Sequence, residues 1–347
     1  MATTIARVLQ ILLVTLPFFA LIAAGYAAAR TGALPLAAIP ALNAFVLYFA
    51  LPCMLFRFGA GAPIEQLLDA GVALVWGLCA LAVVGLTVGL ARRQGIGWND
   101  AAFGALVAAF PNTGFMGLPL LIAILGAQAA SPMIITIAFD LVLTSSLCIA
   151  LSRLDGADAH GPSRAARQAL RGIVQNPMPW AIVLGGAASA LRFQLWAPVE
   201  RTVAMLGDAA SPVALFTIGA VLARSALLAR EHRASARVAQ AMGSGAPAPA
   251  PAQPRPADLL SVAAIKLVAH PLLVYGAGRA AMALGVPLAP SALVAIVLVA
   301  ALPSASNVAL LAERFGADNG RIARIILWTT AAAFFSFPFA VGWVGET

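Results

Sequence analysis

Two polar segments interrupt long apolar runs of this sequence. The first is Pro111-Asn112-Thr113-Gly114, and the second is Pro303-Ser304-Ala305-Ser306-Asn307. Proline removes a backbone donor and clashes with the preceding helical turn, so each segment predicts a broken helix. The half-helix after each break exposes backbone N–H groups, which attract anions. We therefore expect a substrate-binding site made by Asn112, Thr113, Gly114, Ser304, Ser306 and Asn307, beside the helix-breaking Pro111 and Pro303.

Three ionisable side chains lie inside apolar runs, where they could bind a proton or a cation. Asp140 precedes Thr144 by four residues and Lys266 precedes His270 by four, so each pair shares a helix face. A charge in mid-membrane costs about 2.5–3.5 kcal/mol, so such residues often serve a function. Asp140, Lys266 and His270 are the coupling candidates. The alternatives are a structural ion pair for Asp140 and a packed, hydrogen-bonded imidazole for His270, and a structural role is favoured for Asp208.

The composition places these runs in a membrane. The chain has 347 residues, of which 62% are hydrophobic and 10% charged, and its mean hydropathy is +0.94. A soluble domain has about 25% charged residues, so this chain cannot cover a water-facing surface. The net charge of +8 comes mainly from arginine, which marks the cytoplasmic ends of membrane spans and does not indicate nucleic-acid binding here.

The three cysteines, Cys53, Cys79 and Cys148, lie in apolar runs without metal-binding spacing. No metal or other cofactor is expected, apart from H⁺ or Na⁺ as a coupling ion.

Ten stretches are apolar enough to cross a membrane, which takes about 20 residues. A cleaved signal peptide is the alternative for the first, but signal cores usually have about 7–15 residues. The ten are the segment between Arg7 and Arg30, 36–56, 70–91, 101–126, 132–152, 177–191, the segment between Arg201 and Arg224, 259–278, 291–312 and 322–344.

The arginines between these spans predict the orientation. Fifteen fall on one side and five on the other, which predicts that both termini lie outside the cytoplasm. Residues 153–176 are then a cytoplasmic loop. Residues 224–257 include the low-complexity stretch GSGAPAPAPAQPRP and are predicted to be a flexible cytoplasmic linker.

The chain also repeats itself. Residues 52–59 and 212–219 both read P-x-x-L-F-x-x-G, and residues 108–112 and 300–304 both read A-A-apolar-P-polar. Each offset is five helices, an odd number, so the two copies enter the membrane from opposite sides, as in many secondary transporters. A packing kink is the alternative for either proline alone, and two matching breaks argue against it. The predicted fold is an all-α integral membrane protein with ten transmembrane helices in two inverted five-helix repeats, 1–152 and 177–347, in which the fourth and ninth spans are broken and cross.

These motifs resemble the auxin efflux carrier family. The resemblance rests on the stretch FPNTGFMGLP at 110–119, Leu51-Pro52, Leu55-Phe56, and Pro303 followed by Asn307. It implies a scaffold, a mobile transport unit and elevator-like carriage of small carboxylates, such as malonate in bacterial relatives. The plant exporters have their large hydrophilic loop after the fifth span, whereas the larger insert here follows the seventh. This difference argues against auxin as the substrate, so an auxin-like aromatic carboxylate is the alternative and a small carboxylate is the main expectation.

We expect a secondary active transporter of small organic anions in the bacterial inner membrane, with a carboxylate and membrane lipid as its partners. Two other classes of function remain as alternatives. A passive channel is disfavoured by the internal repeat, and an intramembrane aspartyl protease by the residues around Asp140 and Asp208, which lack its motifs. We therefore expect no enzyme. A homodimer fits the Gly85–Gly89 spacing, which is too common in membrane helices to decide.

Overall fold

The computed structural model describes residues 2–61, 69–154, 177–241 and 256–344, and within these ranges the chain forms helices and no β-strand. Two shorter apolar helices, Thr113–Leu125 and Pro290–Ala301, are parts of interrupted helices. The count of ten spans stays a prediction. Six helices in the described part are long and apolar enough to cross a membrane: Leu36–Gly61, Ala70–Arg93, Ala127–Ser152, Ala197–Leu228, Asp258–Ala283 and Asn319–Val344.

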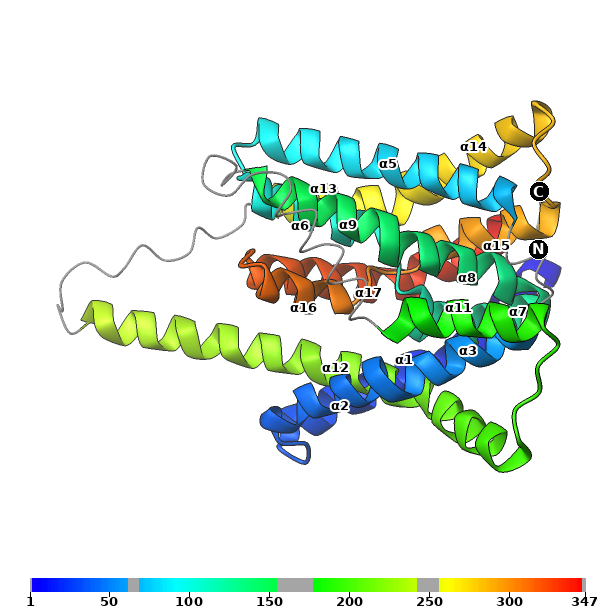
Figure 1. The fold of residues 1–347 in the computed structure, drawn as a ribbon. Helices are drawn as coiled ribbons and strands as arrows, with labels where there is room; N and C mark the ends of the chain where they lie inside the picture. Colours follow the sequence, from blue (N-terminus) through cyan, green and yellow to red (C-terminus); the bar gives the residue numbers. More distant parts are fainter. Residues whose placement is uncertain (1, 62–68, 155–176, 242–255, 345–347) are drawn as a thin grey trace.

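One group of helices is formed by segments from both halves of the chain. Helix α1 packs along α12, and α3 packs along both α11 and α12. These helices lie in the lower part of Figure 1. We call them the first helix group: α1 (Ala2–Thr31), α2 (Ile39–Phe45), the π-helical turn η2 (Val46–Ala50), α3 (Leu51–Gly61), α11 (Pro177–Ala190) and α12 (Ala197–Ala241).

The remaining helices form a second helix group, again drawn from both halves. Helix α5 packs on α6, α8 and α14, and α15 packs on α14 and α17. The group comprises α5 (Ala70–Arg93), α6 (Trp98–Ala109), η3 (Thr113–Gly117), α7 (Leu118–Leu125), α8 (Ala130–Phe139), η5 (Asp140–Thr144), α9 (Ser145–Ser152), α13 (Pro256–Ala264), η7 (Ile265–Ala269), α14 (His270–Ala283), α15 (Pro290–Ala301), α16 (Asn307–Arg314) and α17 (Asn319–Val344).

Helix α12 corrects one prediction. It runs without interruption from Ala197 to Ala241 and projects beyond the other helices in Figure 1. The prediction of a flexible linker from residue 224 onward is therefore wrong for 224–241. Alanine, leucine and arginine dominate this stretch and favour helix, and extending an existing helix needs no new nucleus. The rest of the predicted linker, 242–255, lies outside the described residues, as does 155–176 of the predicted cytoplasmic loop.

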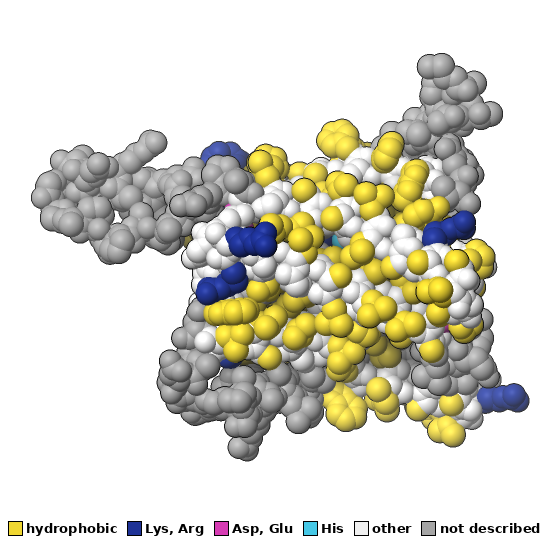
Figure 2. Space-filling view, turned by 90° about the horizontal axis from the view of Figure 1, so that it is seen from above, with side chains coloured by type: hydrophobic (Ala, Val, Ile, Leu, Met, Phe, Trp, Pro, Cys, Tyr) yellow, Lys and Arg dark blue, Asp and Glu magenta, His cyan; other side chains and the backbone are white. Residues whose placement is uncertain are grey.

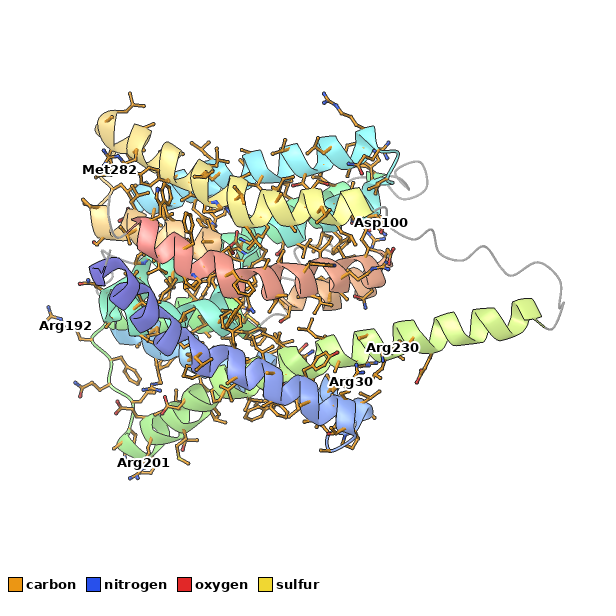
Figure 3. All side chains as sticks on the ribbon, turned by 180° about the vertical axis from the view of Figure 1, so that it is seen from behind. Arg30, Asp100, Arg192, Arg201, Arg230 and Met282 are labelled. Atoms are coloured by element: carbon orange, nitrogen blue, oxygen red, sulfur yellow. The ribbon has the colours of Figure 1, made fainter. Side chains whose placement is uncertain are left out.

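The arginines labelled in Figure 3 lie at two opposite ends of the molecule. Arg30 and Arg230 lie toward one end of the molecule in Figure 3, together with Asp100, whereas Arg192 and Arg201 lie toward the other. The two termini lie together, at the end opposite the projecting part of α12 (Figure 1). Figure 2 shows hydrophobic side chains over the middle of one face, with basic side chains near both ends. This distribution fits a protein whose middle is surrounded by lipid.

Glycines let the helices of the first group touch backbone to backbone. A Cβ at Gly219 on α12 would overlap the carbonyl oxygen of Ile22 on α1. Likewise, a Cβ at Gly59 on α3 would lie 3.2 Å from Cα of Gly185 on α11. Gly59 and Gly219 are the final residues of the two P-x-x-L-F-x-x-G motifs. The repeated motif therefore makes the same kind of close contact twice, each time with a helix from the other half.

A buried ion pair ties three helices of the second group together at one end. The guanidinium of Arg321 on α17 donates two hydrogen bonds to Asp258 on α13, at 2.6 and 2.9 Å, and a third to the carbonyl oxygen of Asp100 on α6, at 2.6 Å. Both side chains of the ion pair are 4% exposed. Arginine and aspartate can be buried together because the planar guanidinium group donates hydrogen bonds to both carboxylate oxygens at once.

We expect Gly219→Ala to destabilise the protein, because the added Cβ must push α1 away from α12. Overpacking of this kind costs about 1–3 kcal/mol. The matched control is Gly276→Ala on α14, where a Cβ would meet nothing within 4 Å. Unfolding of the two purified variants measures the difference. Equal stability would show that the α1–α12 contact is not as tight as described.

We also expect Asp258→Asn to destabilise the protein by about 3–5 kcal/mol, because it leaves the Arg321 guanidinium buried without its counter-charge. The chain offers a matched control in Arg57 and Asp208, which form an exposed ion pair with a 2.7 Å contact. Exposed pairs contribute about 0–1 kcal/mol, so Asp208→Asn should change stability little. Denaturant unfolding measures both variants, and a larger loss at Asp208 would contradict this ranking.

Candidate functional site

Both broken helices change to extended backbone at their prolines. Helix α6 ends at Ala109, and Phe110 has φ −94° and ψ 102°. Helix α15 ends at Ala301, and Leu302 has φ −63° and ψ 155°. The chain becomes helical again only at Thr113, in a π-helical turn, and at Asn307, where α16 begins. Pro111 and Pro303 therefore lie in the two non-helical segments, 110–112 and 302–306.

The two non-helical segments lie against each other and are joined by their backbones. The amide N of Asn112 donates to the carbonyl oxygen of Pro303 at 2.8 Å, and the amide N of Ala305 donates to that of Phe110 at 2.9 Å. Together they make an antiparallel bridge between Pro111 and Ser304. We call this pairing the crossing. Each break leaves backbone N–H and carbonyl groups without a partner inside their own helix, and the other segment supplies one donor and one acceptor for them. Such pairing is needed because a membrane offers no water to the backbone.

Several polar side chains at the crossing are buried without a partner among the described residues. They are the hydroxyls of Thr113 and Ser304 and the side-chain carbonyl of Asn307. Thr113 and Ser304 are fully buried, while the Ser304 amide donates to the hydroxyl of Thr329 on α17 at 3.3 Å. A buried polar atom without a hydrogen bond costs about 1–3 kcal/mol. Such atoms therefore point to a ligand or water at the crossing.

A small cavity opens beside the crossing, where the two helix groups meet. It has an empty volume of about 310 Å³, part of it open to the surroundings. Its polar side chains are Asn112 and Asn307, one from each broken helix. Thr113, Ser304 and Ser306 belong to the crossing but do not line the cavity. Its lining consists of Leu51, Phe110, Pro111, Asn112, Gly114, Phe115, Ile137, Leu141, Met178, Ala305 and Asn307.

The predicted coupling residue Asp140 is fully buried in the second helix group. Its Oδ1 accepts hydrogen bonds from the indole N–H of Trp76 at 3.1 Å and from the hydroxyl of Thr144 at 2.9 Å. Its Oδ2 has no partner in the described part of the chain. No ion pair joins Asp140 to Lys266 in this part, where the ion pairs are those of Arg57 and Arg321.

The other two coupling candidates lie next to the crossing. The Lys266 ammonium donates to the carbonyl oxygen of Ala300, in the last turn of α15, at 2.7 Å. Its Nζ also lies 3.4 Å from Nδ1 of His270, and the His270 ring lies 5.2 Å from the Trp76 ring, centroid to centroid. Lys266 and Asp140 both lie in π-helical turns, which occur frequently at functional sites.

The sequence interpretation missed Trp76 and Thr329. A single tryptophan or threonine in an apolar helix is common, and neither carries a signal of its own. Trp76 becomes notable because its indole N–H reaches Asp140, and Thr329 because its hydroxyl reaches the crossing. In the described part of the chain, no group of three or more His, Cys, Asp or Glu side chains could hold a metal ion.

Comparisons with known proteins place this chain in a family. The chain is 30% identical over 317 residues to the “Putative malonate transporter” of Rhizobium meliloti (strain 1021), covering 91% of this chain and 90% of that one. It is 27% identical over 214 residues to the “Uncharacterized transporter YfdV” of Escherichia coli (strain K12), covering 60% of this chain and 67% of that one. The family model described as “Membrane transport protein” matches residues 11–341. This chain therefore belongs to the membrane transport protein family, the auxin efflux carriers that its broken-helix motifs resemble.

Proposed function

We propose that this protein is a secondary active transporter of small organic anions, with malonate as the first candidate. The observation that carries the proposal is the crossing, where two broken helices bring unpartnered, buried polar atoms together beside a cavity. Membership of a transporter family and the printed name of the Rhizobium meliloti relative support it. Amide donors and helix N-termini bind anions, and a carboxylate is one of the groups found there.

The proposed architecture is ten membrane spans in two inverted repeats, 1–152 and 177–347. The paired contacts of Gly59 and Gly219 support it, because equivalent glycines of the two motifs each receive a helix from the other half. The two broken helices support it as well, since each is interrupted at the matching proline. Half-helices meeting near the bilayer midplane are the usual substrate site of such folds.

The proposed mechanism is an elevator-like alternation of access. The cavity is lined by Leu51 of α3 and Met178 of α11 in the first helix group and by the broken helices of the second. If the second helix group slides against the first, the crossing moves as a unit and carries its bound anion from one side of the membrane to the other. The backbone hydrogen bonds of the crossing stay formed during this motion. Asp140, Lys266 and His270 move with the crossing and would couple this motion to a proton or a cation.

The proposed location is the inner membrane of a bacterium, with both termini in the periplasm. The grouping of Arg30 with Arg230 at one end, opposite Arg192 and Arg201, supports the predicted orientation (Figure 3). We propose no enzymatic activity, and the transporter names of the relatives favour this view.

Counterflow in proteoliposomes tests the function directly. Vesicles loaded with unlabelled malonate should take up labelled malonate transiently and saturably, because a carrier exchanges bound substrate even without an ion gradient. A panel of one-, two- and three-carboxylate acids then ranks the substrates by competition. Uptake that is linear in concentration would indicate a channel, and a panel without any exchange would refute organic-anion transport.

Variants of the two cavity asparagines test the site. We expect Asn112→Ala and Asn307→Ala each to weaken malonate affinity about tenfold or more, because a hydrogen bond to a charged ligand contributes about 1.5–3 kcal/mol. The matched control is Asn43→Ala on α2, which is not part of the cavity lining. The concentration dependence of exchange measures all three. Parent-like affinity in both cavity variants would move the site elsewhere.

A further inference from the structure

A continuous series of buried side chains connects Asp140 to the crossing. Asp140 accepts from the Trp76 indole, the Trp76 ring packs against His270, His270 faces Lys266, and Lys266 donates to Ala300. The first four side chains are fully buried. They come from α5, η5, η7 and α14, whereas Ala300 belongs to the broken helix itself. The series therefore reaches from a buried acid to three residues before Pro303.

Lys266 occupies a place where a cation is stabilised by the backbone. The last carbonyl groups of a helix have no partners within the helix and carry partial negative charge. In secondary transporters, the carbonyl ends of half-helices commonly coordinate the coupling Na⁺ or proton. Here the carbonyl oxygen of Ala300, near the end of the half-helix α15, is already bonded to the Lys266 ammonium at 2.7 Å. The protein thus supplies a cation of its own at this end.

Asp140 and Lys266 lie at the two ends of this series of side chains and form no direct ion pair in the described part of the chain. When Asp140 is ionised, its negative charge partly offsets the positive charge of Lys266 beside the crossing. When Asp140 binds a proton, the Lys266 charge is left uncompensated and attracts an anion more strongly. Proton and anion then bind cooperatively, and the linkage is reciprocal.

The surroundings leave a place for that proton. Asp140 Oδ2 is buried and has no partner among the described residues, and the same holds for His270 Nε2. Among the described residues, the Cys148 thiol on α9 is a further buried ionisable group near Asp140. An ionised carboxylate with one unsatisfied oxygen is costly in a membrane. A proton on Oδ2 removes that cost by forming an O–H bond in place of the charge.

We propose that the coupling ion is a proton bound at Asp140, and that Lys266 takes the place of a metal cation at the carbonyl end of α15. This inference rests on the proposed function and narrows its coupling ion. One proton joins Asp140 when the anion binds and leaves on the other side of the membrane. Trp76 is a positioning residue, because it orients the carboxylate and separates it from His270.

The transport test compares two driving forces in proteoliposomes that already show malonate counterflow. We expect an inwardly directed acid gradient without Na⁺ to drive accumulation, and a Na⁺ gradient at equal pH to add nothing. A pH-sensitive dye inside the vesicles should report protons entering with the anion, a measurement that needs only the parent protein. Accumulation driven by Na⁺ alone, or anion entry without protons, would overturn the proposal and leave the proposed function standing.

Variants separate coupling from binding. Asp140→Asn should retain counterflow but lose acid-driven accumulation about tenfold or more, since coupling between sites typically amounts to about 5–150-fold. Trp76→Phe keeps an aromatic side chain, although a smaller one, and removes the N–H donor, so it should reduce acid-driven accumulation more than counterflow. The matched control is Trp328→Phe on the exposed face of α17, which should behave like the parent. Parent-like accumulation by Asp140→Asn contradicts the proposal.

A separate measurement applies if the parent exchanges no acid, in which case the proposed function fails. The built-in cation is then tested by thermal unfolding of Lys266→Ala, whose shortened side chain leaves room for a small ammonium ion. We expect n-butylammonium chloride to stabilise this variant relative to choline chloride and to leave the parent unchanged, because a ligand stabilises the folded state that binds it. No difference between the two salts in the variant would overturn the assignment of Lys266.

Discussion

A backbone inside a membrane must have its polar groups paired, and this constraint governs the centre of the molecule. Pro111 and Pro303 each release backbone groups that water would satisfy in a soluble protein. Here the two non-helical segments satisfy each other, through the bonds from Asn112 to Pro303 and from Ala305 to Phe110. In the crossing, each break therefore supplies one carbonyl oxygen and one amide N–H to the other, and it brings four helix ends to one place.

The same requirement explains the buried charges around the crossing. Lys266 is stabilised by a carbonyl oxygen at the end of α15, and Asp140 by the donors of Trp76 and Thr144. Arg321, at the end of the second helix group, is satisfied by a carboxylate and a backbone oxygen. The two buried carboxylates, Asp258 and Asp140, differ in how many of their oxygens accept hydrogen bonds. Both oxygens of Asp258 accept hydrogen bonds from Arg321, whereas one oxygen of Asp140 has no partner among the described residues. This difference supports the proposed coupling role of Asp140 and a structural role for Asp258.

Much of this arrangement could be predicted from local sequence, and the rest depends on contacts between distant segments. Pro111 and Pro303 disturb a helix by their own chemistry, so the breaks were predictable. The roles of Trp76 and Thr329 were not, because they depend on which helix faces which. The polar composition of residues 224–241 predicts a flexible linker, yet they form a helix because alanine and arginine are good helix formers. The pairing of Arg321 with Asp258, 63 residues away in the chain, has no local signature in the sequence.

The exchange of partners between the halves has a consequence for how the chain is assembled. Helix α1 meets Gly219 only after α12 has been made, and the carbonyl oxygen of Phe110 meets its donor only after Ala305 has entered the membrane. During synthesis, residues 110–112 are therefore made long before their backbone partners. A chain that stops before residue 303 lacks the carbonyl oxygen of Pro303 and the amide of Ala305, so both of these bonds are lost to the break at Pro111.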